Sequence, residues 1–282
     1  MSLSRREFVT TGIGVGLVSA GAVRLKATPL GLPIGCQTWP VRKMISQDFP
    51  GTLRQLKAAG FDAIEMCSPA GYADSGFGGL VKMKGSEVRQ IIHDAGLDCV
   101  SSHFGMKELR DNQAARIEWA KEVGMTQMLV ASLDGPTHPK MDDVKRAADE
   151  YNKFGEQAAK AGIQQALHDE NFEVSKVDGK RVYDVLFELL DPKLVKFQFQ
   201  ISEVRHGLDA AEYFNKYPGR FISMHVQGWS FETKKETAVG QDSLDWKKIF
   251  AAAKTGGIQN YFVEMDLPLM KASVPYLRKL DV

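Results

Sequence analysis

Cysteine is scarce in this chain, and its scarcity excludes two classes of protein. The 282 residues include 3 cysteines, at positions 36, 67 and 99. An odd number of cysteines in a chain of this length does not build a disulfide scaffold, and no Cys-x-x-Cys pair is present to ligate zinc or to carry redox chemistry. We therefore expect all three cysteines to be small residues of the core.

An excess of charge of either sign is also missing. The chain carries 36 basic and 35 acidic residues, for a net charge of +1. Proteins that bind nucleic acid usually show a clustered basic excess, so nucleic acid is not an expected partner. The apolar run near the start falls short of the ~20 residues that a membrane-spanning helix needs, so we expect no stable membrane span.

The first 27 residues differ in character from the rest of the chain. Ser4-Arg5-Arg6-Glu7-Phe8-Val9 is a twin-arginine pattern, a Gly-rich apolar run follows at 10–18, and Ala20-Gly21-Ala22 offers a small-residue cleavage site. These features predict a twin-arginine export signal and short linker over residues 1–27. The mature protein is then expected to be periplasmic or extracellular.

From residue 28 to residue 282, short β-like runs alternate with helical stretches. The runs span 34–39, 61–67, 97–104, 126–131, 163–170, 195–200, 221–227 and 261–266. Four of the helical stretches stop at glycines, where a left-handed backbone costs little; these are Gly60, Gly96, Gly124 and Gly162. Eight strands in strict alternation with eight helices predict an α/β fold, a single-domain (β/α)8 TIM barrel over 28–282.

The main competitor is a doubly wound open sheet. That fold usually has a Gly-rich phosphate-binding turn after its first strand. Here the first strand ends in Gln37-Thr38-Trp39-Pro40, which is no such turn. The barrel is therefore favoured.

The last four strand-like runs each end in residues that can bind a metal or move a proton. Side chains two apart on a strand share a face, and the carboxyl ends of barrel strands meet at one mouth. The pairs that share a face are His168 with Glu170, Gln198 with Gln200, His225 with Gln227, and Glu264 with Asp266. Imidazole and carboxylate together suit one divalent ion such as Mn²⁺, Zn²⁺ or Co²⁺. Such an ion polarises a carbonyl or hydroxyl while a neighbouring glutamate moves a proton on the adjacent carbon.

Four further residues stand near the predicted mouth with two interpretations open for each. Glu65 ends the second strand and His103 the third, so each faces either the solvent or the site. Trp39 either stacks on a sugar or packs against the protein. Glu173 lies five residues past His168 and could replace Glu170 as the inward carboxylate. The loops 68–83 and 133–140 are long and could act as lids.

Several segments together resemble those of the xylose isomerase-like TIM barrels, the sugar phosphate isomerases and epimerases. The resemblance covers nearly everything after the signal. The segments that carry it are Asp48-Phe49-Pro50-Gly51-Thr52-Leu53, Leu109-Arg110-Asp111-Asn112, Asp191-Pro192-Lys193-Leu194-Val195-Lys196-Phe197, Lys216-Tyr217-Pro218-Gly219-Arg220-Phe221, His225-Val226, Tyr261-Phe262-Val263-Glu264 and the stretch His168-Asp169-Glu170-Asn171-Phe172-Glu173.

The resemblance implies one divalent metal held by a residue from each of the last four strands, with two glutamates serving as acid and base. The implied metal ligands are His168, Glu170, Gln200, His225 and Glu264. Glu170 and Glu264 would exchange the proton. The residues expected to contact the sugar are Trp39, Glu65, His103, Glu173 and Gln227.

Two positions depart from the family pattern. Gln200 stands where the sixth strand usually has Asp, which removes one negative charge and weakens the metal site. Gln227-Gly228 stands where relatives often have Lys-Asp, and the missing lysine weakens the expectation of phosphate binding.

The leading hypothesis is a metal-dependent sugar isomerase or epimerase that acts on a small sugar or glycoside by proton transfer next to a carbonyl. The same proton abstraction could serve a keto-sugar glycoside lyase or hydratase. A rival of another class is a barrel that binds carbohydrate without a metal and without turnover. An abasic-site nuclease of the same clan is disfavoured by the neutral charge. Assembly as a homo-oligomer is left open.

Overall fold

The computed structural model describes residues 28–282, except 133, 135, 137 and 170–174. The predicted export signal and its linker, residues 1–27, lie outside the described residues. Within the described part, none of the helices is both long and apolar enough to cross a membrane.

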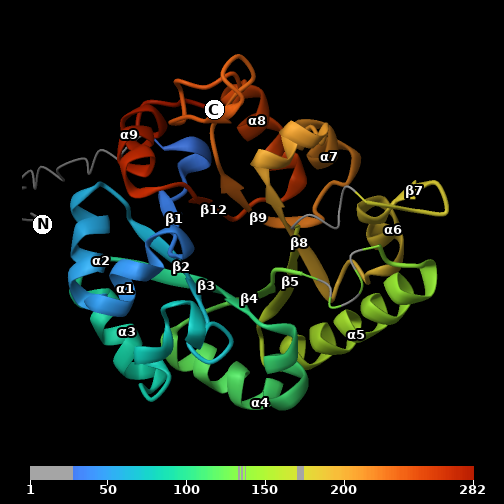
Figure 1. Cartoon of the computed structure of the whole chain (residues 1–282), viewed down its shortest axis with the longest axis horizontal. Coiled ribbons are helices and arrows are strands. Elements are labelled where there is room, and N and C mark those ends of the chain that lie inside the picture. Colours follow the sequence, from blue (N-terminus) through green and yellow to red (C-terminus); the bar gives the residue numbers. More distant parts are fainter. Residues whose placement is uncertain (1–27, 133, 135, 137, 170–174) are drawn as a thin grey trace, which may run out of the picture.

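In the described residues, eight parallel strands close into a barrel in the order β1-β12-β9-β8-β5-β4-β3-β2. The strands are β1 (Gly35–Gln37), β2 (Ala63–Cys67), β3 (Asp98–Phe104), β4 (Gln127–Val130), β5 (Gln164–His168), β8 (Val195–Gln200), β9 (Phe221–Val226) and β12 (Asn260–Val263). The helices around them are α1 (Arg42–Gln47), α2 (Phe49–Ala58), α3 (Gly85–Asp94), α4 (Met106–Val123), α5 (Met141–Lys160), α6 (Val182–Leu189), α7 (Ala210–Lys216), α8 (Trp246–Gly256) and α9 (Leu267–Leu277). Figure 1 shows the helices encircling the ring of strands, which confirms the predicted TIM barrel.

The helix boundaries follow from local sequence. Asp48 caps α2, because its side chain accepts a hydrogen bond from the backbone of Gly51 at 2.8 Å. The buried residues Phe49, Leu53 and Leu56 then recur at helical spacing and face the strands. The glycines predicted to end four helices all have positive φ; they are Gly60, Gly96, Gly124 and Gly162.

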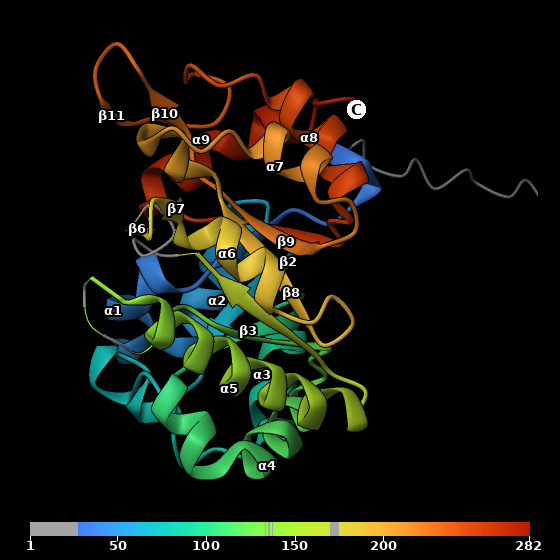
Figure 2. The same ribbon diagram turned by 90° about the vertical axis from the view of Figure 1, so that its right-hand side faces the viewer.

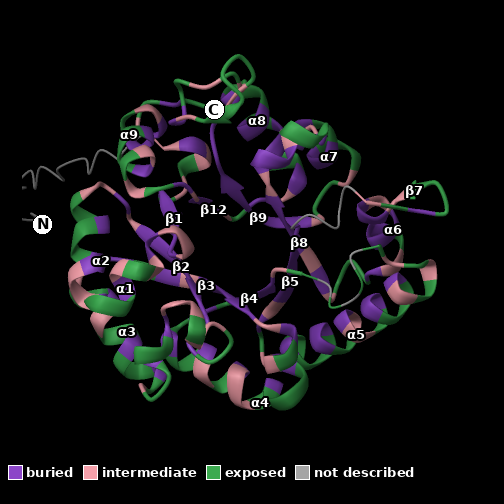
Figure 3. Ribbon diagram, in the orientation of Figure 1, coloured by how far each residue is buried: buried purple, intermediate pink, exposed green. Residues whose placement is uncertain are grey.

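Most of the core lies between the strands and the helices, where Figure 3 shows buried residues on the inner faces of the helices. Leu129, Ala166 and Ile222 form a second, smaller apolar cluster, separate from the main core. Polar side chains also lie buried on the strands, and two of them, Glu65 and Gln198, have no exposed surface. Burying a polar group costs free energy unless it has hydrogen-bond partners, so these residues indicate a polar network inside the barrel.

Two short hairpins were not predicted. They are β6 (Lys176–Val177) with β7 (Lys180–Arg181), and β10 (Trp229–Ser230) with β11 (Lys235–Glu236). Strands of two residues are too short to leave a periodic signal in the sequence. They follow β5 and β9, and Figure 2 shows both hairpins on the same side of the barrel, the side of the strands' carboxyl ends.

Candidate functional site

Three side chains meet where β8, β9 and β12 end. Gln200 is the last residue of β8, His225 lies near the end of β9, and Glu264 directly follows β12. The Gln200 Nε2 donates a hydrogen bond to Glu264 Oε2 at 2.7 Å, and His225 Nδ1 lies 2.9 Å from the same oxygen. The three residues, predicted as metal ligands, are thus in direct contact.

Two further histidines surround His225. The ring centroid of His168 lies 4.5 Å from that of His225, and the ring of His103 stacks on His225 at 5.4 Å. One nitrogen from each of the three rings lies within 4.8 Å of the others. All three histidines are buried. Strands β3, β5 and β9 therefore converge on one small volume inside the barrel.

A fully buried carboxylate, Glu65, lies on the other side of His225 from Glu264. The His225 Nε2 lies 2.5 Å from Glu65 Oε2. Gln37 Nε2 donates to Oε2 of this carboxylate at 2.7 Å, and Ser101 Oγ donates to its Oε1 at 2.5 Å. Gln198 Nε2 also donates to Oε1, at 2.9 Å. These donors replace the water that a carboxylate loses on burial.

The charges of this cluster are coupled. Burial by itself lowers the pKa of His225, but the carboxylates of Glu264 and Glu65 raise it to about 10. Burial by itself raises the pKa of Glu264, yet the charge of His225 and their hydrogen bond hold that pKa below its ordinary value. Burial and the charges of His225 and His103 keep the pKa of His168 well below its ordinary value. These shifts favour the ionised carboxylate of Glu264 and the neutral imidazole of His168.

The donors at the mouth fit a divalent ion. The Gln200 Oε1 is buried and has no hydrogen-bond partner among the described residues. With Nδ1 of His225, which would give up its proton when an ion binds, and the carboxylate of Glu264, it would supply a mixed oxygen and nitrogen set, which suits Mn²⁺, Zn²⁺ or Co²⁺. Rotating the amide would turn Oε1 towards the Glu264 carboxylate, an arrangement that a cation between the two oxygens stabilises.

A polar cavity of about 240 Å³ opens beside Gln200. Its lining residues are Asp169, Gln200, Ser202, Glu203, Arg205, Gln227 and Glu236. The Asp169 Oδ1 accepts the backbone N–H of Gln200 at 2.7 Å, which anchors the end of β8. Gln227 Nε2 donates to Glu236 Oε1 at 2.5 Å, so this predicted sugar-contacting residue lies on the cavity wall.

Two residues expected to contact the sugar lie deep in the barrel. Glu65 has no exposed surface and His103 has 5%. Their contact with a sugar stays a prediction. The Nε2 of His103 lies 2.9 Å from Gln198 Oε1 and 3.3 Å from Glu65 Oε2, so it faces the barrel network. Alternation along a strand predicts the face that a residue occupies but not its depth below the mouth.

The predicted roles of Trp39, Glu170 and Glu173 stay predictions. Trp39 follows β1, and its ring packs edge-on against Tyr72 at 5.9 Å with the Arg42 guanidinium 4.1 Å from its centroid. Its contact with a sugar stays a prediction. Glu170 and Glu173 lie outside the described residues, so the choice between them as the inward carboxylate also stays a prediction.

Sequence reasoning missed part of the cavity wall. Asp169 was passed over because alternation with His168 places it on the opposite face, but β5 ends at His168 and the alternation ends with it. Glu203 and Arg205 lie in the 3-10 helix Ile201–His206 after β8. Glu236 lies in the unpredicted hairpin. Asp169 and Glu203 could have been predicted from the sequence, because each lies within three residues of a strand's carboxyl end.

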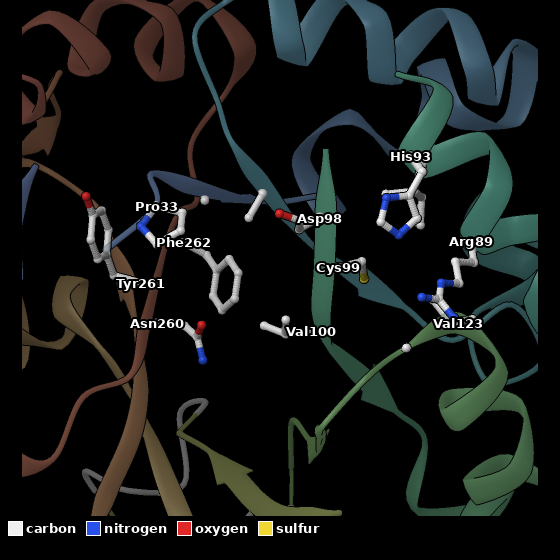
Figure 4. A pocket seen from close by; sticks show the side chains of 14 residues that line it. Pro33, Arg89, His93, Asp98, Cys99, Val100, Val123, Asn260, Tyr261 and Phe262 are labelled. Atoms are coloured by element: carbon white, nitrogen blue, oxygen red, sulfur yellow. The ribbon is translucent and has the colours of Figure 1, made fainter. Parts of the chain in front are cut away.

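A separate pocket of about 270 Å³ lies at the opposite end of the barrel. Its lining includes Gly35, Asp98 and Asn260, each of which begins a strand, and Figure 4 shows Asp98 and Asn260 near the aromatic ring of Phe262. In TIM barrels the amino-terminal face serves stability, whereas reacting groups lie at the carboxyl ends. We therefore place the functional site at the other mouth.

Comparison with known proteins agrees with this geometry. A family model described as xylose isomerase-like TIM barrel matches residues 53–280. The chain belongs to the xylose isomerase-like TIM barrel family. A search of curated protein sequences found no match to it.

Solved structures extend the comparison. A sugar phosphate isomerase/epimerase from Parabacteroides distasonis ATCC 8503 is 25% identical, with a TM-score of 0.72 over 87% of this chain and 93% of its own. An L-ribulose 3-epimerase is 17% identical, with a TM-score of 0.63 over 87% of this chain and 93% of its own. A xylose isomerase-like TIM barrel protein from Mycobacterium smegmatis, in complex with magnesium, is 14% identical, with a TM-score of 0.65 over 90% of this chain and 97% of its own. The neighbours thus include sugar epimerases and a metal complex on the same fold.

Proposed function

We propose that this protein is a metal-dependent sugar isomerase or epimerase that transfers a proton next to a carbonyl. One observation carries the proposal: Gln200, His225 and Glu264 meet at the carboxyl ends of three neighbouring strands, with Glu264 Oε2 at 2.7 Å from the amide and 2.9 Å from the imidazole. In TIM barrels this is the face on which catalysis takes place.

Each residue has a defined part in the proposed reaction. A divalent ion bound there would polarise the carbonyl or hydroxyl oxygen of the sugar and so acidify the adjacent carbon. Gln200, His225 and Glu264 would hold it, with the neutral His168 ring beside His225. Glu264, kept ionised by its neighbours, accepts the proton from the sugar carbon. Glu170 would return the proton, as the family resemblance implies.

The lining of the cavity favours a sugar without a phosphate group. Asp169, Glu203 and Glu236 contribute three carboxylates, and the described lining has one guanidinium, Arg205, which already lies 3.5 Å from Glu203. Carboxylate and amide oxygens accept hydrogen bonds from sugar hydroxyls, whereas they repel a phosphate. We infer that free sugars and keto-sugars are better substrates than sugar phosphates.

The decisive experiment combines metal analysis with isotope exchange. Protein purified without chelator is expected to hold Mn, Zn or Co near one equivalent and to exchange a carbon-bound proton of free or 3-keto sugars in heavy water. Glu264→Gln should slow this exchange by at least about 10²-fold, the usual contribution of a general base. Glu156→Gln, an exposed change on α5, serves as the matched control and should leave exchange unaltered. Full exchange by Glu264→Gln would refute the assignment of the base.

A metal-free carbohydrate-binding barrel is the second candidate. It is favoured by one observation, namely that the Gln200 amide donates to Glu264 and so satisfies this carboxylate without a cation. Sugar binding by protein that contains no Mn, Zn or Co and exchanges no proton would support this candidate over the enzyme.

A further inference from the structure

The ring of His225 is held at both of its nitrogens. Its Nδ1 faces the mouth, 2.9 Å from Glu264 Oε2, and its Nε2 faces the barrel interior, 2.5 Å from Glu65 Oε2. Turning the ring over would place carbon atoms against both carboxylates and lose both hydrogen bonds. The orientation that presents Nδ1 to the mouth is therefore set by these two contacts.

Glu65 is itself fixed. Its Oε2 accepts from Gln37 and His225, and its Oε1 accepts from Ser101 and Gln198, so both oxygens are occupied. The donors come from β1, β3, β8 and β9, so strands on both sides of β2 hold one carboxylate. A carboxylate with no exposed surface and four donors has no freedom to follow a substrate.

Aromatic neighbours complete the support of His225. His103 stacks on its ring, with an interplanar angle of 10°, and Phe262 packs edge-on at 6.4 Å. These contacts restrict the plane of the ring but do not distinguish one nitrogen from the other. Among the described contacts inside the barrel, the Glu65 carboxylate supplies that distinction at Nε2.

We propose that Glu65 is a positioning residue that holds His225 by Nε2 and so presents Nδ1 to the divalent ion at the mouth. The inference rests on the proposed function, because it assigns a role towards the metal that this function requires. Carboxylates that hold a histidine in this way typically change metal affinity 10- to 100-fold when they are replaced. Glu65 would thus support the reaction without touching the sugar.

Glu65→Gln tests the proposal, because an amide has one acceptor oxygen where the carboxylate has two. An NH2 group in place of Oε1 would face the NH2 of Gln198, and in place of Oε2 it would face the NH2 of Gln37 and Nε2 of His225. Zinc titration by calorimetry is expected to show affinity about 10- to 100-fold weaker than in the wild type. Long-range ¹H–¹⁵N spectra of the zinc-loaded protein should show ligation through Nδ1 in the wild type and loss of that single pattern in the variant.

Glu150→Gln is the matched control. Glu150 lies on α5, away from the cavity beside Gln200, and its Oε2 accepts a hydrogen bond from Arg110 Nη2 at 2.6 Å, so the change also removes a hydrogen-bonded carboxylate. It should leave the His225 signals and the zinc affinity unchanged. Glu65→Asp keeps the charge but shortens the side chain by one methylene, and it provides the same measurement if Glu65→Gln fails to fold.

The outcomes separate the two proposals. A Glu65 variant that binds zinc as tightly as the wild type, with unaltered His225 signals, would overturn the positioning role and leave the proposed function standing. A wild type that binds no zinc, manganese or cobalt would overturn both. Weaker binding together with a changed His225 pattern in the Glu65 variants alone supports the inference.

Discussion

Replacing Gln200 with glutamate changes a neutral hydrogen-bond donor at the mouth into a negatively charged acceptor and keeps the shape of the side chain. In the present structure the Gln200 amide donates to Glu264 Oε2 at 2.7 Å, a hydrogen bond to a charged group that contributes about 1.5–3 kcal/mol. The Gln200→Glu variant would lose this bond and would place a second carboxylate beside the first. At ~4 Å and an effective dielectric constant of ~20, two like charges repel by about 4 kcal/mol.

The repulsion has opposite consequences with and without metal. Uptake of a proton by one carboxylate relieves much of it in the metal-free protein, so we expect Gln200→Glu to lower the free energy of unfolding by about 2–3 kcal/mol, measured by urea denaturation. With metal, the added charge is an added ligand. We expect the dissociation constant for Mn²⁺ or Zn²⁺ to fall at least about tenfold, which corresponds to about 1.4 kcal/mol.

Calorimetric titration with Mn²⁺ and Zn²⁺ is the assay, and Gln227→Glu is the matched control. Gln227 lines the same cavity but donates to Glu236, so its replacement changes the charge equally without reaching Glu264. Its effect on metal affinity should be the smaller of the two. If Gln200→Glu destabilises the protein but binds metal no more tightly than the wild type, Gln200 does not adjoin the metal and the proposed ligand set is wrong.

Three further predictions address other parts of the chain. In metal-free protein, the raised pKa of His225 contributes stability that is fully present below its ordinary value of 6.5 and is lost as the pH rises through about 10. The lowered pKa of Glu65 contributes stability that is present above its ordinary value of 4.5 and is lost as the pH falls. The difference in urea midpoint between wild type and His225→Gln should therefore shrink above about pH 10, and a constant difference would contradict the coupling. Asp48→Ala removes the cap of α2 and should cost about 1 kcal/mol, seen as a melting temperature lower by roughly 2–4 °C with unchanged metal affinity. Replacing Arg5 and Arg6 together with lysine should abolish export, measured by cell fractionation, and normal export would refute the signal.

Much of the architecture follows from local patterns that are legible in the chain alone. Apolar runs of strand length, helices of period 3.6 and glycines at helix ends each reflect short-range sterics and hydrogen bonding, and their strict alternation leaves a parallel barrel as the natural solution. The same alternation places His225 and Glu264 at the carboxyl ends of neighbouring strands, so the proximity of these two side chains was predictable before any coordinates. The observed contact of 2.9 Å between them agrees with that prediction.

The depth of each side chain in the barrel and its hydrogen-bond partners were not predictable in this way, because both depend on how the strands are staggered. Between β8 and β9 the register shifts, since Phe197 pairs with Phe221 but Gln198 pairs with Ser223, and this extra residue brings His225 level with Gln200. A one-residue slip would turn these side chains to the other face. The burial of Glu65 and its donors from four other strands likewise arise only when the barrel closes. Pairing between distant strands therefore brings the Glu65 carboxylate against His225 Nε2, a contact that the sequence alone did not predict.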